Sequence, residues 1–247
     1  MTKALQPLKG KVALVVGGSR GIGAGIARRL AEDGAGITLT NAAAADKAHE
    51  LVQQIAAGGV RAIAIKADSG HEAELRDAVA KTLQLFGRLD ILVVNAGVLI
   101  HGGILEYRME DLDRILAVNV RGVVVAIQAA AAHMGQGGRV ITIGSNTAVR
   151  TGFPGASIYS MTKGAIASLV RGVAIDLAPR GITVNNVQPG PTVTDMTSGL
   201  AERVTPLIPL GRMGSTAEIA AMVAYLVGPE SGFVTGASMT IDGGYVA

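Results

Sequence analysis

Short apolar segments rich in β-branched residues alternate with long segments rich in Ala and Leu along this chain. Seven short segments are predicted strands: residues 12–16, 37–40, 61–66, 91–94, 140–143, 183–187 and 238–241. Predicted helices begin between them, near Gly21, Ala45, His71, Met109, Ser157 and Thr216. This alternation is typical of repeated βαβ units with parallel strands. Since such crossovers are right-handed, the sequence predicts an α/β fold, a doubly wound parallel sheet with helices on both faces.

Two helix starts carry the sequence of a capping box, Ser69 with Glu72 and Ser215 with Glu218. No linker, low-complexity tract or internal repeat interrupts the series of predicted elements. We therefore expect residues 1–247 to form a single domain.

The composition excludes several classes of protein. Hydrophobic residues make up 49% of the chain and charged residues 17%, against about 25% charged in typical domains, so it is not intrinsically disordered. Without cysteine there is no disulfide framework, thiolate zinc site or iron–sulfur cluster. The four histidines (His49, His71, His101 and His133) have no partner at helical spacing, so we predict no metal site.

Charge and hydropathy argue against nucleic-acid and membrane partners. The net charge is +3, the basic residues are scattered, and aromatic residues make up only 3% of the chain. Nucleic-acid binding favours a basic stripe with interleaved aromatic residues. No apolar run approaches the roughly 18 residues of a membrane span, and residues 12–16 are too short for a signal peptide. We expect a cytoplasmic protein.

A glycine-rich turn connects the first predicted strand to the first helix. Residues 17–23 read Gly-Gly-Ser-Arg-Gly-Ile-Gly. At such a helix start, free N–H groups and the helix dipole both attract an anion. A simple tight turn is the alternative in a chain with 34 glycines, but the position directly after the first strand favours phosphate binding.

Tyr159 and Lys163 are four residues apart at the start of a predicted helix, so their side chains share one face. A nearby ammonium favours ionisation of a phenol, and such a pair can exchange a proton with a carbonyl or alcohol oxygen. Ser145 follows a strand end, where its hydroxyl could bond the same oxygen. The alternatives are a surface pair and a loop-capping serine. Asn119, inside an apolar helix, either pins that helix or has a functional role.

Five separated motifs, spread over nearly the whole chain, resemble those of the short-chain dehydrogenase/reductase family. They are the glycine turn, Asn95-Ala96-Gly97, Asn119, Ser145 with Tyr159 and Lys163, and Pro189-Gly190 followed by Thr192 and Thr194. The resemblance implies a Rossmann-type fold. It also implies hydride transfer between a nicotinamide cofactor and a ketone or secondary alcohol.

The resemblance assigns roles to residues of this chain. Tyr159 would be the catalytic acid/base, Ser145 would orient the substrate carbonyl, and Lys163 would lower the tyrosine pKa and hold the nicotinamide ribose. Asn119 would keep a water in the proton relay, and Asp68 would meet the adenine. The implied cofactor contacts are Gly17, Ser19, Arg20, Gly21, Ile22, Gly23, Thr40, Asn41, Asp68, Ser69, Asn95, Ala96, Gly97, Tyr159, Lys163, Pro189, Gly190, and Thr192 and Thr194 beside the nicotinamide carboxamide.

Three positions depart from the family's pattern. Val16 and Val94 stand where the family usually has Thr and often has Asn, so a hydroxyl that ties two loops together is missing, at about 1 kcal/mol. Ser145 lies fourteen residues before Tyr159, whereas thirteen is the commoner spacing and Asn146 occupies it. We choose Ser145 because a loop absorbs one extra residue easily.

The end of the second predicted strand bears on cofactor choice. An acidic residue about 20 residues past the glycine turn selects NAD, and a basic residue accommodates the 2′-phosphate of NADP. No carboxylate occurs here before Asp46, and Arg20 could reach the phosphate, with Thr40 and Asn41 adding neutral hydrogen bonds. The alanines at 42–45 supply no second cation, and a solvated Arg20 is the alternative. We predict NADP(H) as the preferred cofactor, with NAD(H) possible.

We therefore predict an NADP(H)-dependent oxidoreductase for a small ketone or secondary alcohol with a hydrophobic substituent, which suits the apolar loops at 98–104, 149–153 and 196–200. A 3-oxoacyl thioester on acyl carrier protein or coenzyme A is the alternative substrate, although the neutral segment 133–138 lacks basic residues for carrier docking. A nicotinamide-binding sensor without turnover is the alternative from another class. Intact Tyr159 and Lys163 argue against it.

The helices predicted at 109–133 and 157–177 carry small or apolar residues on more than one face. Examples are Gly122, Ala126, Ala129, Gly164, Ala167 and Gly172. Since contiguous apolar patches above a few hundred Å² are rare on monomers, we expect a homo-oligomer. The family resemblance implies a tetramer.

Overall fold

Seven parallel strands form one sheet in the order β3-β2-β1-β4-β5-β6-β7. The computed structural model describes residues 6–247, so residues 1–5 of the expected domain lie outside the described residues. The strands are β1 Val12–Val16, β2 Gly36–Asn41, β3 Ala62–Lys66, β4 Ile91–Val94, β5 Arg139–Ile143, β6 Thr183–Pro189 and β7 Ser238–Ile241. The predicted doubly wound parallel sheet is confirmed, with every strand within two residues of its predicted bounds.

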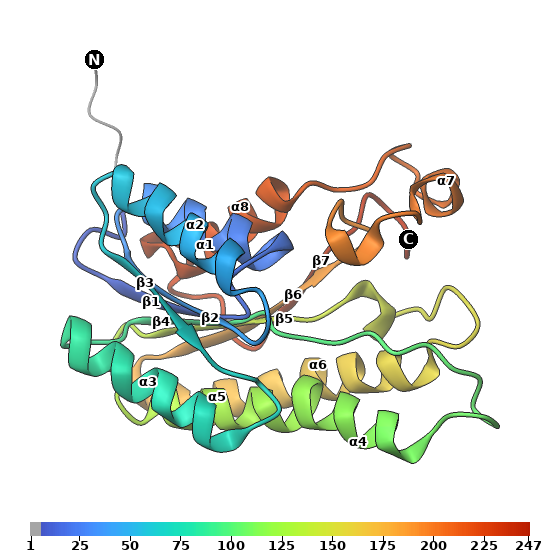
Figure 1. Cartoon of the computed structure of the whole chain (residues 1–247), viewed down its shortest axis with the longest axis horizontal. Helices are drawn as coiled ribbons and strands as arrows, with labels where there is room; N and C mark the ends of the chain where they lie inside the picture. Colours follow the sequence, from blue (N-terminus) through green and yellow to red (C-terminus); the bar gives the residue numbers. More distant parts are fainter. Residues whose placement is uncertain (1–5) are drawn as a thin grey trace.

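Helices cover both faces of this sheet (Figure 1). One face carries α1 Gly21–Glu32, α2 Ala45–Ala57 and α8 Thr216–Val227, and the other carries α3 Glu72–Phe86, α5 Gly122–Ala131 and α6 Ser157–Leu177. Both faces of the sheet are apolar, and strand β1 illustrates the reason. Its successive side chains point to opposite faces of the sheet, and each face is covered by helices. Ala13 and Val15 join the core beneath α1, α2 and α8, whereas Leu14 and Val16 join the core beneath α3, α5 and α6.

The helix predicted from Met109 onward is interrupted. It begins as α4 Met109–Leu116, widens into a π-helical turn at Ala117–Arg121 and continues as α5. The whole run Met109–Ala131 is long and apolar enough to cross a membrane by length and composition, but 61% of its most apolar window is buried inside the fold. A core helix has the same property. A short helix, α7 Ala201–Val204, lies between β6 and β7 in the sequence (Figure 1).

The capping box at the start of α8 is confirmed. The Ser215 hydroxyl accepts a hydrogen bond from the Glu218 N–H at 3.2 Å, and the Glu218 carboxylate accepts one from the Ser215 N–H at 2.8 Å. Both free donors at the helix start are thereby satisfied.

The capping box predicted at Ser69 and Glu72 is wrong. Helix α3 starts at Glu72 with His71 at the N-cap position, and Ser69 belongs to the preceding loop. Glu74 reaches back instead: its carboxylate accepts the Asp68 N–H at 2.7 Å and contacts the His71 ring at 2.9 Å. The acidic residue that reaches back therefore lies two positions later than the sequence pattern suggested.

The strand order reverses direction between β1 and β4. Crossovers from β1 lead to β2 and β3 on one side, and those from β4 lead to β5, β6 and β7 on the other. At such a switch point the loops after the strands diverge and leave a crevice at the carboxyl ends. The predicted site residues follow the carboxyl ends of these strands or lie on the helices beside them.

Candidate active site

The glycine turn lies at the carboxyl end of β1, beside the switch point. Gly17 has a positive φ of 75°, which favours glycine. A Cβ on Gly23 would overlap the Gly17 carbonyl oxygen, so this glycine lets the start of α1 pack against the strand end. The first N–H groups of α1 have no helical acceptor, and the helix dipole adds a positive potential there. This turn fits a phosphate group.

Two side chains fasten the glycine turn to neighbouring strands. The Asn95 amide, just past β4, donates to the Gly17 carbonyl at 2.7 Å, and the Thr40 hydroxyl at the end of β2 accepts the Gly17 N–H at 2.9 Å. These two hydrogen bonds connect the turn to β2 and to the loop after β4, although Val16 and Val94 lack the usual polar side chains. Contact of Thr40 and Asn95 with the cofactor stays a prediction.

Asn95→Ala is expected to lower the free energy of unfolding by about 1–2 kcal/mol, because it leaves the Gly17 carbonyl without this partner. Denaturant unfolding monitored by circular dichroism measures the change. The exposed Gln54, which bonds only Arg28 on the surface, gives a matched control as Gln54→Ala, with little expected loss. Equal stability of Asn95→Ala and the wild type would contradict the assigned contact.

Tyr159 and Lys163 lie in the first two turns of α6. The Lys163 ammonium nitrogen is 5.6 Å from the centre of the Tyr159 ring and donates a 3.0 Å hydrogen bond to the carbonyl of Ile143, the last residue of β5. Only 6% of Lys163 is exposed. The lysine is therefore fixed between a central strand and the tyrosine, which excludes the surface-pair alternative.

Burial shifts the pKa of both groups toward their neutral forms. It raises the pKa of Tyr159 to about 12, against a smaller lowering by a hydrogen bond with Ser145, and it lowers the pKa of Lys163 to about 8. A lowering of the tyrosine pKa by Lys163 stays a prediction, because burial is the largest influence on the pKa of both groups here. At neutral pH the phenol is protonated, and the lysine is mostly charged.

Ser145 is the hydroxyl beside Tyr159. Its oxygen also accepts hydrogen bonds from the N–H and the hydroxyl of Thr147, at 3.2 and 3.0 Å. Asn146, which occupies the commoner spacing, donates instead to the Asp242 carboxylate at 3.2 Å. The structure therefore separates the two neighbours, with Ser145 at the tyrosine and Asn146 at the C-terminal segment. Thr147 and Asp242 were missed, because neither contact has a characteristic sequence spacing.

Asn119 lies in the π-helical turn between α4 and α5. Its side-chain oxygen accepts the Val98 N–H at 2.8 Å, and its amide donates to the Val98 carbonyl at 2.9 Å and the Thr162 hydroxyl at 3.2 Å. The pinning role is thus present, and it fixes the loop after β4. A Cβ on Gly97 would lie 3.5 Å from both the Asn119 oxygen and the Lys163 nitrogen, so glycine there leaves room for both.

The segment after β6 crosses the glycine turn. Pro189 ends the strand, Gly190 follows, and the Thr192 hydroxyl donates to the Gly190 carbonyl at 3.0 Å. The methyl carbon of Thr194 is 3.4 Å from the position that a Cβ on Gly21 would occupy. The loop after β6 therefore packs directly against the glycine turn, at the carboxyl ends of the strands where a crevice is expected.

Asp68 and Ser69 follow β3 at the outer end of the cleft. The Asp68 carboxylate accepts hydrogen bonds from the Gly70 N–H at 2.8 Å and the Arg114 guanidinium at 3.0 Å. Burial raises the pKa of this carboxyl, but the hydrogen bonds outweigh burial and leave it below its ordinary value. Ser69 is buried. An adenine contact by Asp68 stays a prediction, since Arg114 already holds its carboxylate.

Comparison with known proteins identifies the family. Residues 16–246 match the family described as Enoyl-(Acyl carrier protein) reductase. A short-chain dehydrogenase/reductase from Serratia marcescens BCRC 10948 is 53% identical, with a TM-score of 0.96 over 98% of this chain and 100% of that one. This chain is a short-chain dehydrogenase/reductase. The resemblance seen in the motifs is confirmed, and the chain belongs to a family of NAD(P)-dependent oxidoreductases.

Two further relatives of this short-chain dehydrogenase/reductase differ in what their names describe. A short-chain dehydrogenase from Burkholderia cenocepacia J2315, solved in complex with NADP, is 47% identical, with a TM-score of 0.96 over 98% of this chain and 100% of that one. The cyclic-di-GMP-binding biofilm dispersal mediator protein of Escherichia coli (strain K12) is 42% identical over 241 residues, 96% of this chain and 98% of that protein. The relatives of this chain thus include a dehydrogenase solved with NADP and a protein named for binding cyclic-di-GMP.

The cleft of this short-chain dehydrogenase/reductase has the donors that a dinucleotide requires. The free N–H groups at the start of α1 suit a pyrophosphate, and the exposed Arg20 stands at the N-cap position of that helix. Buried Asn41 ends β2. Among residues 6–247, no three His, Asp or Glu side chains come together to hold a metal ion.

Proposed function

We propose that this protein is an NADP(H)-dependent oxidoreductase that interconverts a ketone and a secondary alcohol at Ser145, Tyr159, Lys163 and Asn119. The observation that carries the proposal is the position of Tyr159 next to the buried Lys163, whose ammonium nitrogen is 5.6 Å from the centre of the tyrosine ring and is fixed on the Ile143 carbonyl, with buried Ser145 following the same strand. Three observations support NADP(H): Arg20 in the glycine turn, the lack of a carboxylate at the end of β2, and the NADP of the Burkholderia protein. We propose a cytoplasmic protein acting on a small molecule.

The side chains divide the proton and charge chemistry between them. Bound nicotinamide would supply or accept the hydride. As the substrate oxygen gains negative charge, Tyr159 donates its proton to that oxygen, and a hydrogen bond from Ser145 stabilises it. The Lys163 ammonium then offsets the charge left on the phenolate. Asn119 holds the Val98 loop beside these groups.

The entrance to the proposed site is apolar. Exposed apolar side chains stand on the loops that follow β4, β5 and β6: Ile104, Leu105, Val149, Val193 and Met196. The rings of His101 and Phe153 are 5.4 Å apart and connect two of these loops. A ketone with a hydrophobic substituent would cover part of this surface, which favours such a substrate over a small polar one.

Two observations keep other functions in view. The matched family is described as Enoyl-(Acyl carrier protein) reductase, and that description supports an acyl thioester substrate. The neutral segment 133–138 precedes β5 and therefore lies at the amino ends of the strands, whereas Tyr159 lies at their carboxyl ends. The segment gives carrier docking no support. The name of the Escherichia coli relative supports a nucleotide-binding sensor.

A panel of substrates tests the proposal. The absorbance of reduced nicotinamide is followed with NADPH and hydrophobic ketones, polar ketones and a 3-oxoacyl coenzyme A thioester. We expect the highest kcat/KM with hydrophobic ketones. Faster reduction of the thioester than of any ketone would favour the acyl reductase. If no substrate is turned over while calorimetry shows tight binding of cyclic-di-GMP, the sensor function replaces the proposal.

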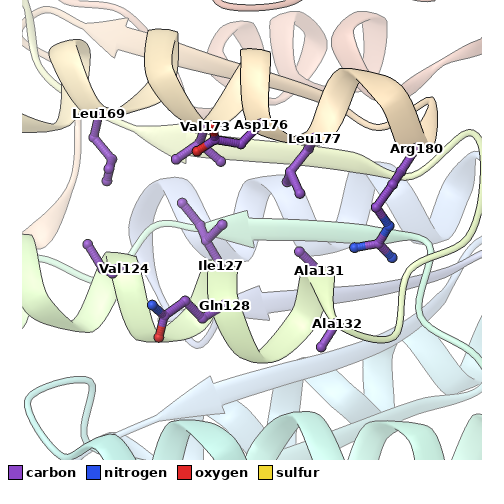
Figure 2. A pocket seen from close by; sticks show the side chains of 10 residues that line it. All are labelled: Val124, Ile127, Gln128, Ala131, Ala132, Leu169, Val173, Asp176, Leu177 and Arg180. Carbon is purple, nitrogen blue, oxygen red and sulfur yellow. The ribbon is translucent and has the colours of Figure 1, made fainter.

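We propose a homo-oligomer, most simply a tetramer, and the outer surface between α5 and α6 supports it. Figure 2 shows a groove there, lined by Val124, Ile127, Leu169, Val173 and Leu177 with Gln128, Asp176 and Arg180 among them. This surface overlaps only part of the one expected from the sequence, because Gly172 on α6 is exposed there whereas Gly122, Ala126 and Ala129 on α5 are buried within the chain. The partly exposed apolar groove is what a second copy would cover.

Light scattering at micromolar concentration is expected to report a multiple of the 25.0 kDa chain mass. Leu169→Glu in the groove should lower that mass, because it places a charge in an apolar contact. Leu85→Glu, at an exposed apolar position on α3, is the matched control and should leave the mass unchanged. A wild type of 25 kDa would overturn the proposal.

A further inference from the structure

An ion pair connects two distant segments at the rim of the cleft. The Lys47 ammonium is 2.8 Å from the Asp195 carboxylate, although 148 residues separate them. Lys47 lies in the first turn of α2, just after the end of β2, and Asp195 lies in the loop that crosses the glycine turn. Their side chains are 56% and 58% exposed. We call this pair the rim pair.

The rim pair belongs to a larger charge cluster. The Lys47 hydrogen bond holds the pKa of the Asp195 carboxyl below its ordinary value, and the positive charge of Arg20 contributes in the same direction. Thr194, next to Asp195, packs against Gly21 of the glycine turn. Arg20, Lys47 and Asp195 therefore gather where the glycine turn, the start of α2 and the loop after β6 meet.

Fold stability gives little reason for this arrangement. Exposed ion pairs contribute only about 0–1 kcal/mol. Lys47 also stands at the positive end of the α2 dipole, where a cation is disfavoured by roughly 0.3–1 kcal/mol. The Lys47 ammonium is held by an exposed carboxylate at the unfavourable end of a helix dipole. An anion of higher charge could therefore take the place of that carboxylate.

We propose that Lys47 is a second cation for the 2′-phosphate of NADP(H) and that Asp195 competes with the nucleotide for it. The inference rests on the proposed use of NADP(H). A phosphate monoester carries about −1.5 to −2 charges and three acceptor oxygens, so it attracts the ammonium more strongly than one carboxylate does. The sequence prediction of no second cation at 42–45 holds for those positions, but the fold brings the cation from one helical turn further on. NADH, which lacks the 2′-phosphate, would leave the rim pair intact.

Binding measurements on the purified full chain test the inference without turnover. NADPH and NADH are titrated by the fluorescence of their own reduced nicotinamide. Lys47→Gln is expected to weaken NADPH binding about tenfold, close to the value of one charge-assisted hydrogen bond, with NADH changed less than about twofold. Asp195→Asn should tighten NADPH binding several-fold and leave NADH unchanged. In a Lys47→Gln background, Asp195→Asn should have no effect on NADPH.

A pair of the same kind elsewhere provides the control. Lys81 and Asp77 form an exposed pair at 2.7 Å on α3, and Lys81→Gln and Asp77→Asn should alter neither nucleotide. Weaker NADPH binding in Asp195→Asn, or equal losses for both nucleotides in Lys47→Gln, would overturn the inference. If the wild type prefers NADPH and the Lys47 and Asp195 variants keep that preference, the role of the rim pair is rejected and the proposed function stands. A wild type that binds neither nucleotide would reject the proposed function as well.

Discussion

Tyr159→Phe is expected to lower kcat by about 10²- to 10⁴-fold while NADPH binding changes little, because only the proton-bearing hydroxyl is removed. The ring stays beside Lys163 and keeps the packing of α6. Steady-state kinetics with the best ketone give kcat, and nucleotide titration gives the binding constant. Lys163→Ala should lose both rate and affinity, because the proposed roles of its ammonium include both the phenolate and the nicotinamide ribose. Near-full turnover in Tyr159→Phe would remove tyrosine from the proposed mechanism.

The direction of the reaction adds a pH test of the same residue. The pKa of Tyr159 is raised to about 12, so the phenol is protonated through the neutral range and is ready to donate in ketone reduction. Alcohol oxidation needs the phenolate, whose population grows as pH rises toward that value. The oxidation rate of the wild type is therefore expected to rise with pH as long as Lys163, whose pKa is lowered to about 8, keeps the charge that stabilises the phenolate. The rise should disappear in Tyr159→Phe, and a rise that persists there would point to another base.

Arg20→Ala is expected to reduce the preference for NADPH over NADH by about 1.5–3 kcal/mol, which is roughly 10- to 100-fold in the ratio of kcat/KM values. Arg20 is exposed at the start of α1, and its charge acts on Asp195 across the cleft. Removal of the guanidinium takes one charge-assisted hydrogen bond from the 2′-phosphate, and NADH has no such group to lose.

The deciding measurement for Arg20 is kcat/KM with both nucleotides in both proteins. Arg76→Ala, which breaks an exposed pair with Glu72 on α3, is the control and should keep the wild-type ratio. Equal kcat/KM values for NADPH and NADH in the wild type, or the same ratio in Arg20→Ala, would mean that this residue does not read the 2′-phosphate.

Local patterns were enough to predict the sheet and the order of the site motifs. The strands are near-continuous apolar runs because helices bury both faces, and most helix starts fall at the predicted residue. The π-helical turn was not predictable, because Ala117–Arg121 has the composition of an ordinary helix. Within this turn Asn119 makes two hydrogen bonds to the Val98 backbone, a contact between distant segments that the local sequence does not reveal.

Polar contacts between distant segments were also beyond sequence reasoning. Thr40 and Asn95 were expected near the cofactor, but their contacts with Gly17 could not be foreseen from the sequence. Lys47 gave no signal at all, since its partner Asp195 is 148 residues away. Such contacts depend on which loops the strand order brings together, and the spacing of residues along the chain does not reveal that order.

The π-helical turn determines how the helix around Asn119 would respond to a change in length. A π turn bonds each residue to the fifth one along rather than the fourth, so it stores one surplus residue. A single-codon deletion within Ala117–Arg121 could therefore be absorbed by closure into a regular α-helix, with α5 still in phase with its core. The same deletion inside α5 would rotate the following residues by about 100° and turn apolar side chains outward. Loss of one residue is therefore expected to disturb the hydrophobic core less in the π-helical turn than in α5.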